Sequence, residues 1–372
     1  MRPIDMAESP LRRGAGATPF DHHPMLAIWE LTQACDLACV HCRASATPDR
    51  QRDELSTDEG KALLNRIAAM GTRLVVLTGG DPAKRPDLVE LVAHGAAAGL
   101  TMALTPSGTP LFTRALGERL RDAGLARLAV SVDGPDAATH DAFRRVPGSF
   151  DESMRILADA RAVGLPVQVN TSLGPHDAAA LHAMADLVEG IGAVLWSVFL
   201  VVETGRATRS LLLGPRALEA LLSELAEIGE RAPFDVKTTA APHFRRIQLE
   251  RKHGGALGVL HDVDERGVVK GLRGINDGAG FVFVSHRGDV YPSGFLPLRA
   301  GNVREEDIAR VYRDHPLFRL LRDPDSLEGK CGACPFRRVC GGSRARAFAA
   351  TGNVTAADPA CAYVPRGYSP ES

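Results

Sequence analysis

Several features are scarce or missing in this sequence of 372 residues. Neither sign of charge dominates, because 44 Lys and Arg accompany 45 Asp and Glu, so the net charge does not predict a nucleic-acid partner. The longest near-continuous apolar run covers residues 191–202, which is too short to cross a membrane as a helix. Residues 1–20 lack the apolar core of a secretion signal. The sequence therefore predicts a cytoplasmic protein with no membrane or nucleic-acid partner.

Cysteine is missing from most of the chain and concentrated near its two ends. Seven cysteines occur, and none lies between Cys42 and Cys331. In the reducing cytoplasm these thiols are not expected to form disulfides. Clustered cysteines instead indicate metal binding, because cysteines that serve packing are scattered along a chain.

Apolar runs typical of strands alternate with segments of helical periodicity from residue 25 to about residue 203. Six such strand–helix units predict an α/β fold, a partial (βα)6 barrel that is like a TIM barrel but open. A β-hairpin is expected over residues 281–291. The expected divisions are a flexible arm (1–24), the partial barrel (25–205), a helical linker and loop (206–275) and a small cysteine-rich domain (276–372).

Cys35, Cys39 and Cys42 follow the first expected strand with the spacing C-x3-C-x2-C. A cubane [4Fe–4S] cluster has four irons, so three thiolates leave one iron open. The amino and carboxylate groups of S-adenosylmethionine (SAM) can chelate that iron. A zinc site is the alternative, but three thiolates leave zinc short of its usual four ligands.

This spacing, at the end of a first strand, resembles the radical SAM superfamily. The resemblance implies that an electron from the reduced cluster cleaves SAM, and that the 5′-deoxyadenosyl radical so formed abstracts hydrogen from a substrate. Because the radical comes from SAM, the sequence identifies no catalytic side chain with certainty.

A second motif supports the resemblance. Gly79-Gly80-Asp81-Pro82 follows the second expected strand and is similar to the family's Gly-Gly-Glu-Pro motif, whose backbone and acid bind the SAM amino group. His41 lies where the family usually places a ring beside the adenine. Polar residues at the ends of successive strands are further expected SAM contacts, with ordinary turn chemistry as the alternative for each: Ser107, Ser131, Asp133 and Asn170.

The C-terminal cysteines are spaced C-x2-C-x5-C-x20-C, as Cys331, Cys334, Cys340 and Cys361. Four thiolates can hold a structural zinc ion or ligate a second [4Fe–4S] cluster completely. The run resembles the SPASM or twitch extension of radical SAM enzymes, which holds auxiliary iron–sulfur clusters. A second auxiliary cluster in such a domain would need a further cysteine in the hairpin region, but the residue there is Ser293. The sequence therefore predicts two clusters in all.

Short sequence motifs around these cysteines resemble those of the radical SAM enzymes of alternative haem and haem d1 biosynthesis. Examples are Cys340-Gly-Gly-Ser-Arg-Ala-Arg and Asp358-Pro-Ala-Cys361. The resemblance implies a small-molecule substrate, a tetrapyrrole whose side chains are decarboxylated or trimmed, and an electron donor such as a flavodoxin or ferredoxin. Arginine suits the carboxylates of such a substrate. The candidate substrate contacts, with surface solvation as the alternative, are His243, Arg245, Arg246, Arg344 and Arg346.

Two other functions stay open. Maturases of ribosomally made peptides share this architecture, although residues 1–24 are short for a peptide-clasping wing and are rich in Pro, Gly and Arg. A non-catalytic iron–sulfur or haem-carrying protein is the other alternative. An assay of SAM cleavage distinguishes it from an enzyme.

Overall fold

The computed structural model describes residues 19–174, 180–252 and 274–369. One sheet of ten strands forms its centre, in the order β10-β9-β8-β1-β2-β3-β4-β5-β6-β7. The strands are β1 (Leu26–Glu30), β2 (Leu74–Thr78), β3 (Thr101–Leu104), β4 (Leu125–Ser131), β5 (Val167–Leu173), β6 (Leu195–Leu200), β7 (Asp235–Thr239), β8 (Phe281–Val284), β9 (Asp289–Tyr291) and β10 (Gly301–Asn302). The pairs from β8 through β1 to β7 are all parallel, whereas β9 pairs antiparallel with both β8 and β10.

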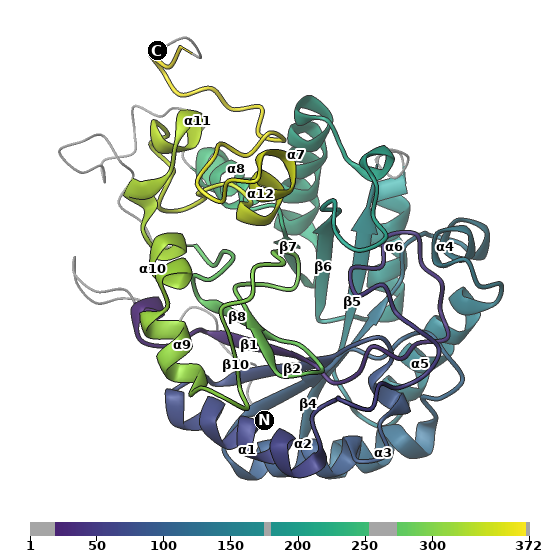
Figure 1. The fold of residues 1–372 in the computed structure, drawn as a ribbon. Helices are drawn as coiled ribbons and strands as arrows, with labels where there is room; N and C mark the ends of the chain where they lie inside the picture. Colours follow the sequence, from purple (N-terminus) through teal and green to yellow (C-terminus); the bar gives the residue numbers. More distant parts are fainter. Residues whose placement is uncertain (1–18, 175–179, 253–273, 370–372) are drawn as a thin grey trace.

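Helices cover the outer face of this curved sheet, as Figure 1 shows. They are α1 (Thr57–Met70), α2 (Leu88–Ala97), α3 (Arg114–Asp122), α4 (Ala137–Arg144), α5 (Ser149–Ala162), α6 (Leu181–Ile191), α7 (Pro215–Arg231) and α8 (His243–Lys252). The C-terminal helices are α9 (Ile308–Asp314), α10 (Pro316–Arg322), α11 (Gly329–Gly332) and α12 (Arg344–Thr351). None of the described helices combines the length and the apolar character that a membrane crossing requires.

The strand–helix unit β2–α2 and its neighbour α1 illustrate how the sequence forms these layers. Ser56 caps α1 and exchanges hydrogen bonds with Glu59 in a capping box. Along β2, Val75 and Leu77 are fully buried among the helices, while the alternate residues are only half-buried. Strand side chains alternate between two faces, so each strand has a helix-covered face and an opposite one. We call the opposite, concave side of the sheet the lumen face.

The α/β fold with a partial barrel is confirmed, and two details differ from expectation. Residues 206–275 were expected to be a helical linker and loop, but they add strand β7 and helix α8. Strand β7 has the sequence Asp-Val-Lys-Thr-Thr, whose polar residues hide the strand signal. The expected hairpin forms, and its first strand β8 pairs in parallel with β1. The C-terminal region is therefore continuous with the barrel sheet; the expected arm lies mostly outside the described residues.

Candidate functional site

The three-cysteine loop begins directly after β1. Cys35 and Cys39 are buried, and Cys42 is half-buried. Backbone N–H groups point at two of the sulfurs, from Leu37 to Cys35 Sγ (3.4 Å) and from Ala46 to Cys42 Sγ (3.5 Å). Burial raises the pKa of the Cys35 thiol, so a lone thiolate is disfavoured there. Such a thiolate needs a bound cation, and the N–H donors then stabilise its remaining charge.

The glycines of the Gly-Gly-Asp-Pro motif hold this loop in place. The Gly80 N–H donates to the Thr32 carbonyl at 2.7 Å, and the Asp81 N–H donates to the Ala34 carbonyl at 2.6 Å. A Cβ on Gly79 would lie 2.5 Å from the Thr32 oxygen, and one on Gly80 would collide with the Ala34 carbonyl group. Only glycine therefore allows the end of β2 to pack against the backbone that leads into Cys35.

Asp81 is turned into the protein. Its fully buried carboxylate accepts hydrogen bonds from the Thr109 hydroxyl (2.6 Å), the Ala83 N–H (3.0 Å) and the Ser107 N–H (3.4 Å). These bonds connect the loop after β2, where Pro82 begins a short 3-10 helix, to the loop after β3. The carboxylate therefore braces two loops; its expected contact with the SAM amino group stays a prediction.

Ser107 lies between the two motifs, as its position after β3 suggested. Its hydroxyl donates to the Gly80 carbonyl at 2.7 Å and lies 3.3 Å from Cys35 Sγ. Ser131 and Asn170 are adjacent in the register of β4 and β5 on the lumen face. The structure thus brings these predicted residues to one edge of the sheet. Their contact with SAM stays a prediction.

A buried ion pair lies beside Cys39. The Asp133 carboxylate accepts from Arg144 Nε at 2.5 Å and from the Ser172 N–H at 2.7 Å, and Arg144 Nη1 also reaches Cys39 Sγ at 3.6 Å. Burial acts to raise the pKa of Asp133, but Arg144, the nearby histidines and the Ser172 N–H together outweigh it, and the pKa is lowered. Asp133 thus acts through Arg144 on the cysteine loop. Sequence reasoning missed Arg144 because it lies in helix α4, which the periodicity did not reveal.

His41 stacks on Phe143 with ring centroids 4.3 Å apart and an interplanar angle of 18°. Burial lowers the pKa of His41 to about 4, despite the opposing charge of Asp133. The ring is therefore neutral near pH 7, and its Nδ1 has no hydrogen-bond partner among the described residues. A neutral stacked ring is suited to lie beside an adenine, as predicted.

Sequence reasoning also missed a charged cluster between β1 and β8. The buried Glu30 carboxylate accepts from Arg43 Nη2 at 2.7 Å and lies 2.9 Å from His286 Nδ1. The Arg43 guanidinium lies 4.5 Å from the centroid of the Phe283 ring. The available signal was a glutamate at the end of an apolar strand just before the first cysteines. The cluster connects the cysteine loop to the C-terminal hairpin.

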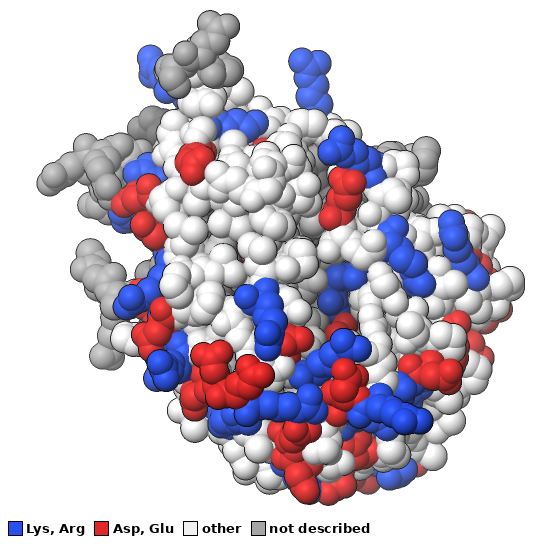
Figure 2. Space-filling model, in the orientation of Figure 1, with Lys and Arg blue, Asp and Glu red and all other residues white. Residues whose placement is uncertain are grey.

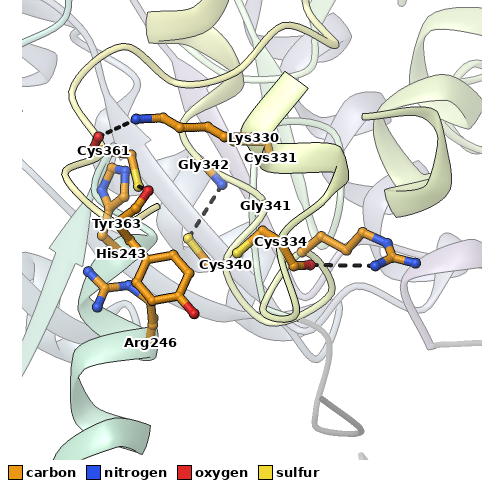
Figure 3. Close-up of a pocket in the computed structure, with 11 residues that line it drawn as sticks. His243, Arg246, Lys330, Cys331, Cys334, Cys340, Gly341, Gly342, Cys361 and Tyr363 are labelled. Carbon is orange, nitrogen blue, oxygen red and sulfur yellow. Dashed lines mark hydrogen bonds between the residues drawn. The ribbon is translucent and has the colours of Figure 1, made fainter. Parts of the chain in front are cut away.

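The four C-terminal cysteines line one cavity, shown in Figure 3. All are free thiols, and burial raises the pKa of Cys334 and of Cys340 to about 12. Backbone N–H groups of Gly342 and Asp358 point at Cys340 Sγ and Cys331 Sγ, each at 3.4 Å. In the described parts of the chain, no three His, Cys, Asp or Glu side chains form a group that could hold one metal ion. Four thiols around one cavity are a donor set that suits an iron–sulfur cluster or a structural zinc ion, and the expected auxiliary cluster stays a prediction.

Asp358 is the centre of the network that shapes this cavity. Its fully buried carboxylate accepts from the Ser343 N–H (2.7 Å) and from Arg346 Nη1 (3.1 Å), and it lies 3.2 Å from His243 Nε2. Burial acts to raise the pKa of Asp358, but Arg346 and His243 hold it far below its ordinary value. We call Asp358 the hub of the cavity, because its contacts join α8, α12 and the segment that carries Cys361.

The predicted substrate arginines are already engaged within the protein. Arg245 donates to the Val339 and Ile275 carbonyls, both at 2.8 Å. Arg344 donates to the Val354 and Ala356 carbonyls and reaches Cys331 Sγ at 3.8 Å. Arg246 forms ion pairs with Glu219 and Glu250, and Arg346 forms one with Asp358. These contacts show bracing roles, and the expected roles of these arginines and His243 in substrate binding stay predictions.

Known proteins resemble this chain along most of its length. A family model described as Radical SAM superfamily matches residues 29–188. An AdoMet-dependent heme synthase of Methanosarcina barkeri is 40% identical over 92% of this chain and 97% of its own. A PqqA peptide cyclase of Rhodopseudomonas palustris is 30% identical, over 92% of this chain and 88% of its own. The solved structure of Streptococcus suis SuiB bound to S-adenosylmethionine has a TM-score of 0.69 at 16% identity, over 92% of this chain and 78% of that one.

The chain belongs to the radical SAM superfamily. Membership means an enzyme that uses SAM and a [4Fe–4S] cluster. That the three-cysteine loop holds this cluster stays a prediction, with which its N–H donors to sulfur are consistent. The likeness to the heme synthase extends well beyond the matched family domain, because it covers 92% of the chain.

Proposed function

We propose that this enzyme forms haem by decarboxylating propionate side chains of an iron-containing tetrapyrrole. The observation that carries the proposal is the 40% identity, over nearly the full length of both chains, to a relative named AdoMet-dependent heme synthase. The peptide cyclase is matched at 30% identity over a similar length. The chain is thus more similar to the haem-forming relative than to the peptide cyclase over a comparable length.

For the cofactors, we propose one [4Fe–4S] cluster on Cys35, Cys39 and Cys42 and an auxiliary [4Fe–4S] cluster on the four C-terminal cysteines. When bound and reduced, the first cluster supplies the electron that cleaves SAM into methionine and a 5′-deoxyadenosyl radical. The backbone of Gly79 and Gly80 and the polar residues Ser107, Ser131 and Asn170 would orient SAM. His41 would lie against the adenine ring.

The proposed reaction balances as follows. Transfer of one hydrogen atom from the propionate to the 5′-deoxyadenosyl radical gives 5′-deoxyadenosine and a substrate radical. Loss of carbon dioxide and one electron from that radical leaves a vinyl group. The electron needs an acceptor within the enzyme, and the buried four-cysteine cavity is in a position to house one. A flavodoxin or ferredoxin is the proposed external electron donor.

The test is anaerobic turnover of iron coproporphyrin by the reconstituted, dithionite-reduced enzyme with SAM. We expect products that have each lost the elements of formic acid, with 5′-deoxyadenosine formed in parallel. A mass spectrum with unchanged porphyrin, alongside substrate-dependent modification of a peptide, would instead support a peptide maturase. No 5′-deoxyadenosine under any condition would contradict SAM cleavage itself.

Metal analysis tests the cofactor assignment separately. We expect about eight irons per chain, the content of two cubanes. About four irons with one zinc would assign the C-terminal cysteines to a structural zinc site. The four-cysteine cavity would then have no part in electron transfer.

A further inference from the structure

A row of polar side chains crosses the lumen face of four neighbouring strands. The register aligns Ser131 of β4 with Asn170 of β5, Asn170 with Ser197 of β6, and Ser197 with Lys237 of β7. The intervening residues of these strands, such as Val130, Val169, Trp196 and Val198, belong to the helix-covered core. The row therefore extends from the expected SAM contacts, Ser131 and Asn170, to a lysine at the edge of the sheet.

Arg127 of β4 adds a second positive charge to this face. It lies two and four residues before Ala129 and Ser131, so its side chain shares their side of the strand. In the parts of the chain that the structure describes, neither Arg127 nor Lys237 has a hydrogen-bond or ion-pair partner. The hydroxyl of Ser197, buried between Asn170 and Lys237, also has none there. Asp235 is near enough to affect Arg127 but forms no ion pair with it in the structure.

The two cations lie on the lumen face, the concave side of the sheet. Lys237 reaches solvent, yet desolvation and the charge of Arg127 lower its pKa to about 8. Figure 2 shows a hollow between the C-terminal elements and the α6 side, with Lys or Arg side chains in it. At pH 7 both groups are charged, and no residue that the structure describes forms an ion pair with either.

The opposite wall of the lumen is mostly apolar; only its upper end carries charge, where Glu30 pairs with Arg43 and His286 and Arg43 lies over the Phe283 ring. The lumen-face residues of β8, β1 and β2 form a continuous patch in register, in which Ile28 lies between Phe283 and Val76, and Leu26 between Phe281 and Leu74. Most of them are only half-buried. One side of the lumen thus offers apolar surface and the other offers unpaired positive charge. A flat hydrophobic ring with carboxylates on its edge has the complementary distribution.

We propose that Lys237 and Arg127 bind carboxylates of the substrate while its macrocycle rests on the apolar wall of β8, β1 and β2. This assignment rests on the proposed tetrapyrrole function and adds the residues that select a carboxylated ring. It also fits the contrast with Arg245, Arg344 and Arg346, which have partners within the protein, whereas among the described residues these two cations have none. Lys237 and Arg127 are positioning residues for the substrate and take no part in bond breaking.

The experiment compares iron coproporphyrin with its tetramethyl ester, which keeps the ring and removes the charges. Binding of each to the reconstituted enzyme is measured from the Soret band. Lys237→Met and Arg127→Met are each expected to weaken binding of the free acid by roughly 10- to 100-fold and to leave binding of the ester unchanged. Lys237→Arg should restore most of the loss. Arg119→Met, which removes an exposed cation from the outer helix α3, is the matched control and should bind both ligands like the wild type.

Two results would overturn the assignment while leaving the proposed function intact. One is wild-type binding of the free acid by both Met variants. The other is an equal loss for acid and ester, which indicates a purely structural role. If the wild-type enzyme binds neither ligand, the proposed tetrapyrrole function fails and the assignment fails with it.

Discussion

Each cysteine group lies beside a buried Asp–Arg ion pair that is connected to a cysteine sulfur. At the first group, Arg144 bridges Asp133 and Cys39. At the second, Asp358 pairs with Arg346, and its own N–H points at Cys331. The surroundings differ. The first three cysteines lie on one short loop whose shape is imposed by the strand ends, especially by Gly79 and Gly80, whereas the last four surround a cavity of their own.

This difference suggests a division of labour. A loop with three thiolates, held from outside, can present an open iron to an external ligand. A cavity with four thiolates can complete the coordination of its metal and needs no further ligand. The most direct test of this difference in role is to remove one cysteine from each group.

The largest effect is expected from Cys35→Ala, which should abolish SAM cleavage because it removes a ligand of the proposed SAM-binding cluster. Cys340→Ala should impair turnover of the substrate more than SAM cleavage. Both are measured as 5′-deoxyadenosine and modified substrate released by anaerobic, reduced enzyme. Equal loss of SAM cleavage in the two variants would contradict the division of labour.

The next effect concerns the hub of the C-terminal cavity. Asp358→Asn removes the charge that compensates Arg346 and leaves that arginine buried without a counter-charge, so the free energy of unfolding should fall by about 3–5 kcal/mol. Denaturant unfolding under reducing conditions measures it. The control is Asp122→Asn, which breaks an exposed pair with Arg121 (2.6 Å) and should cost less than about 1 kcal/mol. Similar losses in both variants would show that Asp358 is not a hub.

The dependence of the first group on its neighbours is tested at a glycine. Gly80→Ala places a Cβ against the Ala34 carbonyl, and this overpacking should cost about 1–3 kcal/mol and weaken SAM cleavage. Gly190→Ala in α6 is the matched control, because its Cβ meets nothing within 4 Å, and helix propensity predicts a gain of about 0.5–1 kcal/mol. Thermal unfolding distinguishes the two. An unchanged melting temperature for Gly80→Ala would show that the cysteine loop adapts freely.

The smallest effect is a pH dependence near the first group. Burial lowers the pKa of His140 from 6.5 to about 4, against the attraction of Asp133. Between these two values the unfolded chain binds more protons, so stability should fall as the pH drops from about 6.5 to about 4, by about 1–3 kcal/mol. The pKa of His41 is lowered to the same value, so both histidines contribute to the slope. His140→Asn keeps an acceptor for the Asp133 N–H and should reduce the slope by about half. His22→Asn, at an exposed position, should retain the wild-type slope, and the same slope in both variants would exclude His140 as its source.

Local patterns determined how much of this molecule could be predicted from its sequence. The alternation of strands and helices and the spacing of the cysteines are local, and they predicted the partial barrel and both candidate metal sites. Strand β7 was missed because Asp235 and Lys237 face the lumen and remove the apolar pattern of a core strand. The pairing of Glu30 with His286 and the inward turn of Asp81 were not predictable, since they depend on residues that meet only in the folded chain.

The parallel pairing of β8 with β1 has a consequence for synthesis on the ribosome. Leu26 pairs with Phe281, so one edge of β1 stays unpaired until the last third of the chain leaves the ribosome. At ordinary translation rates this delay is roughly ten seconds or more. An exposed parallel edge is prone to pair with other chains, and its late closure makes folding slow. The strand from which the first three cysteines extend is thus fully paired only when the hairpin forms, so formation of the hairpin sets when the cysteine loop can mature.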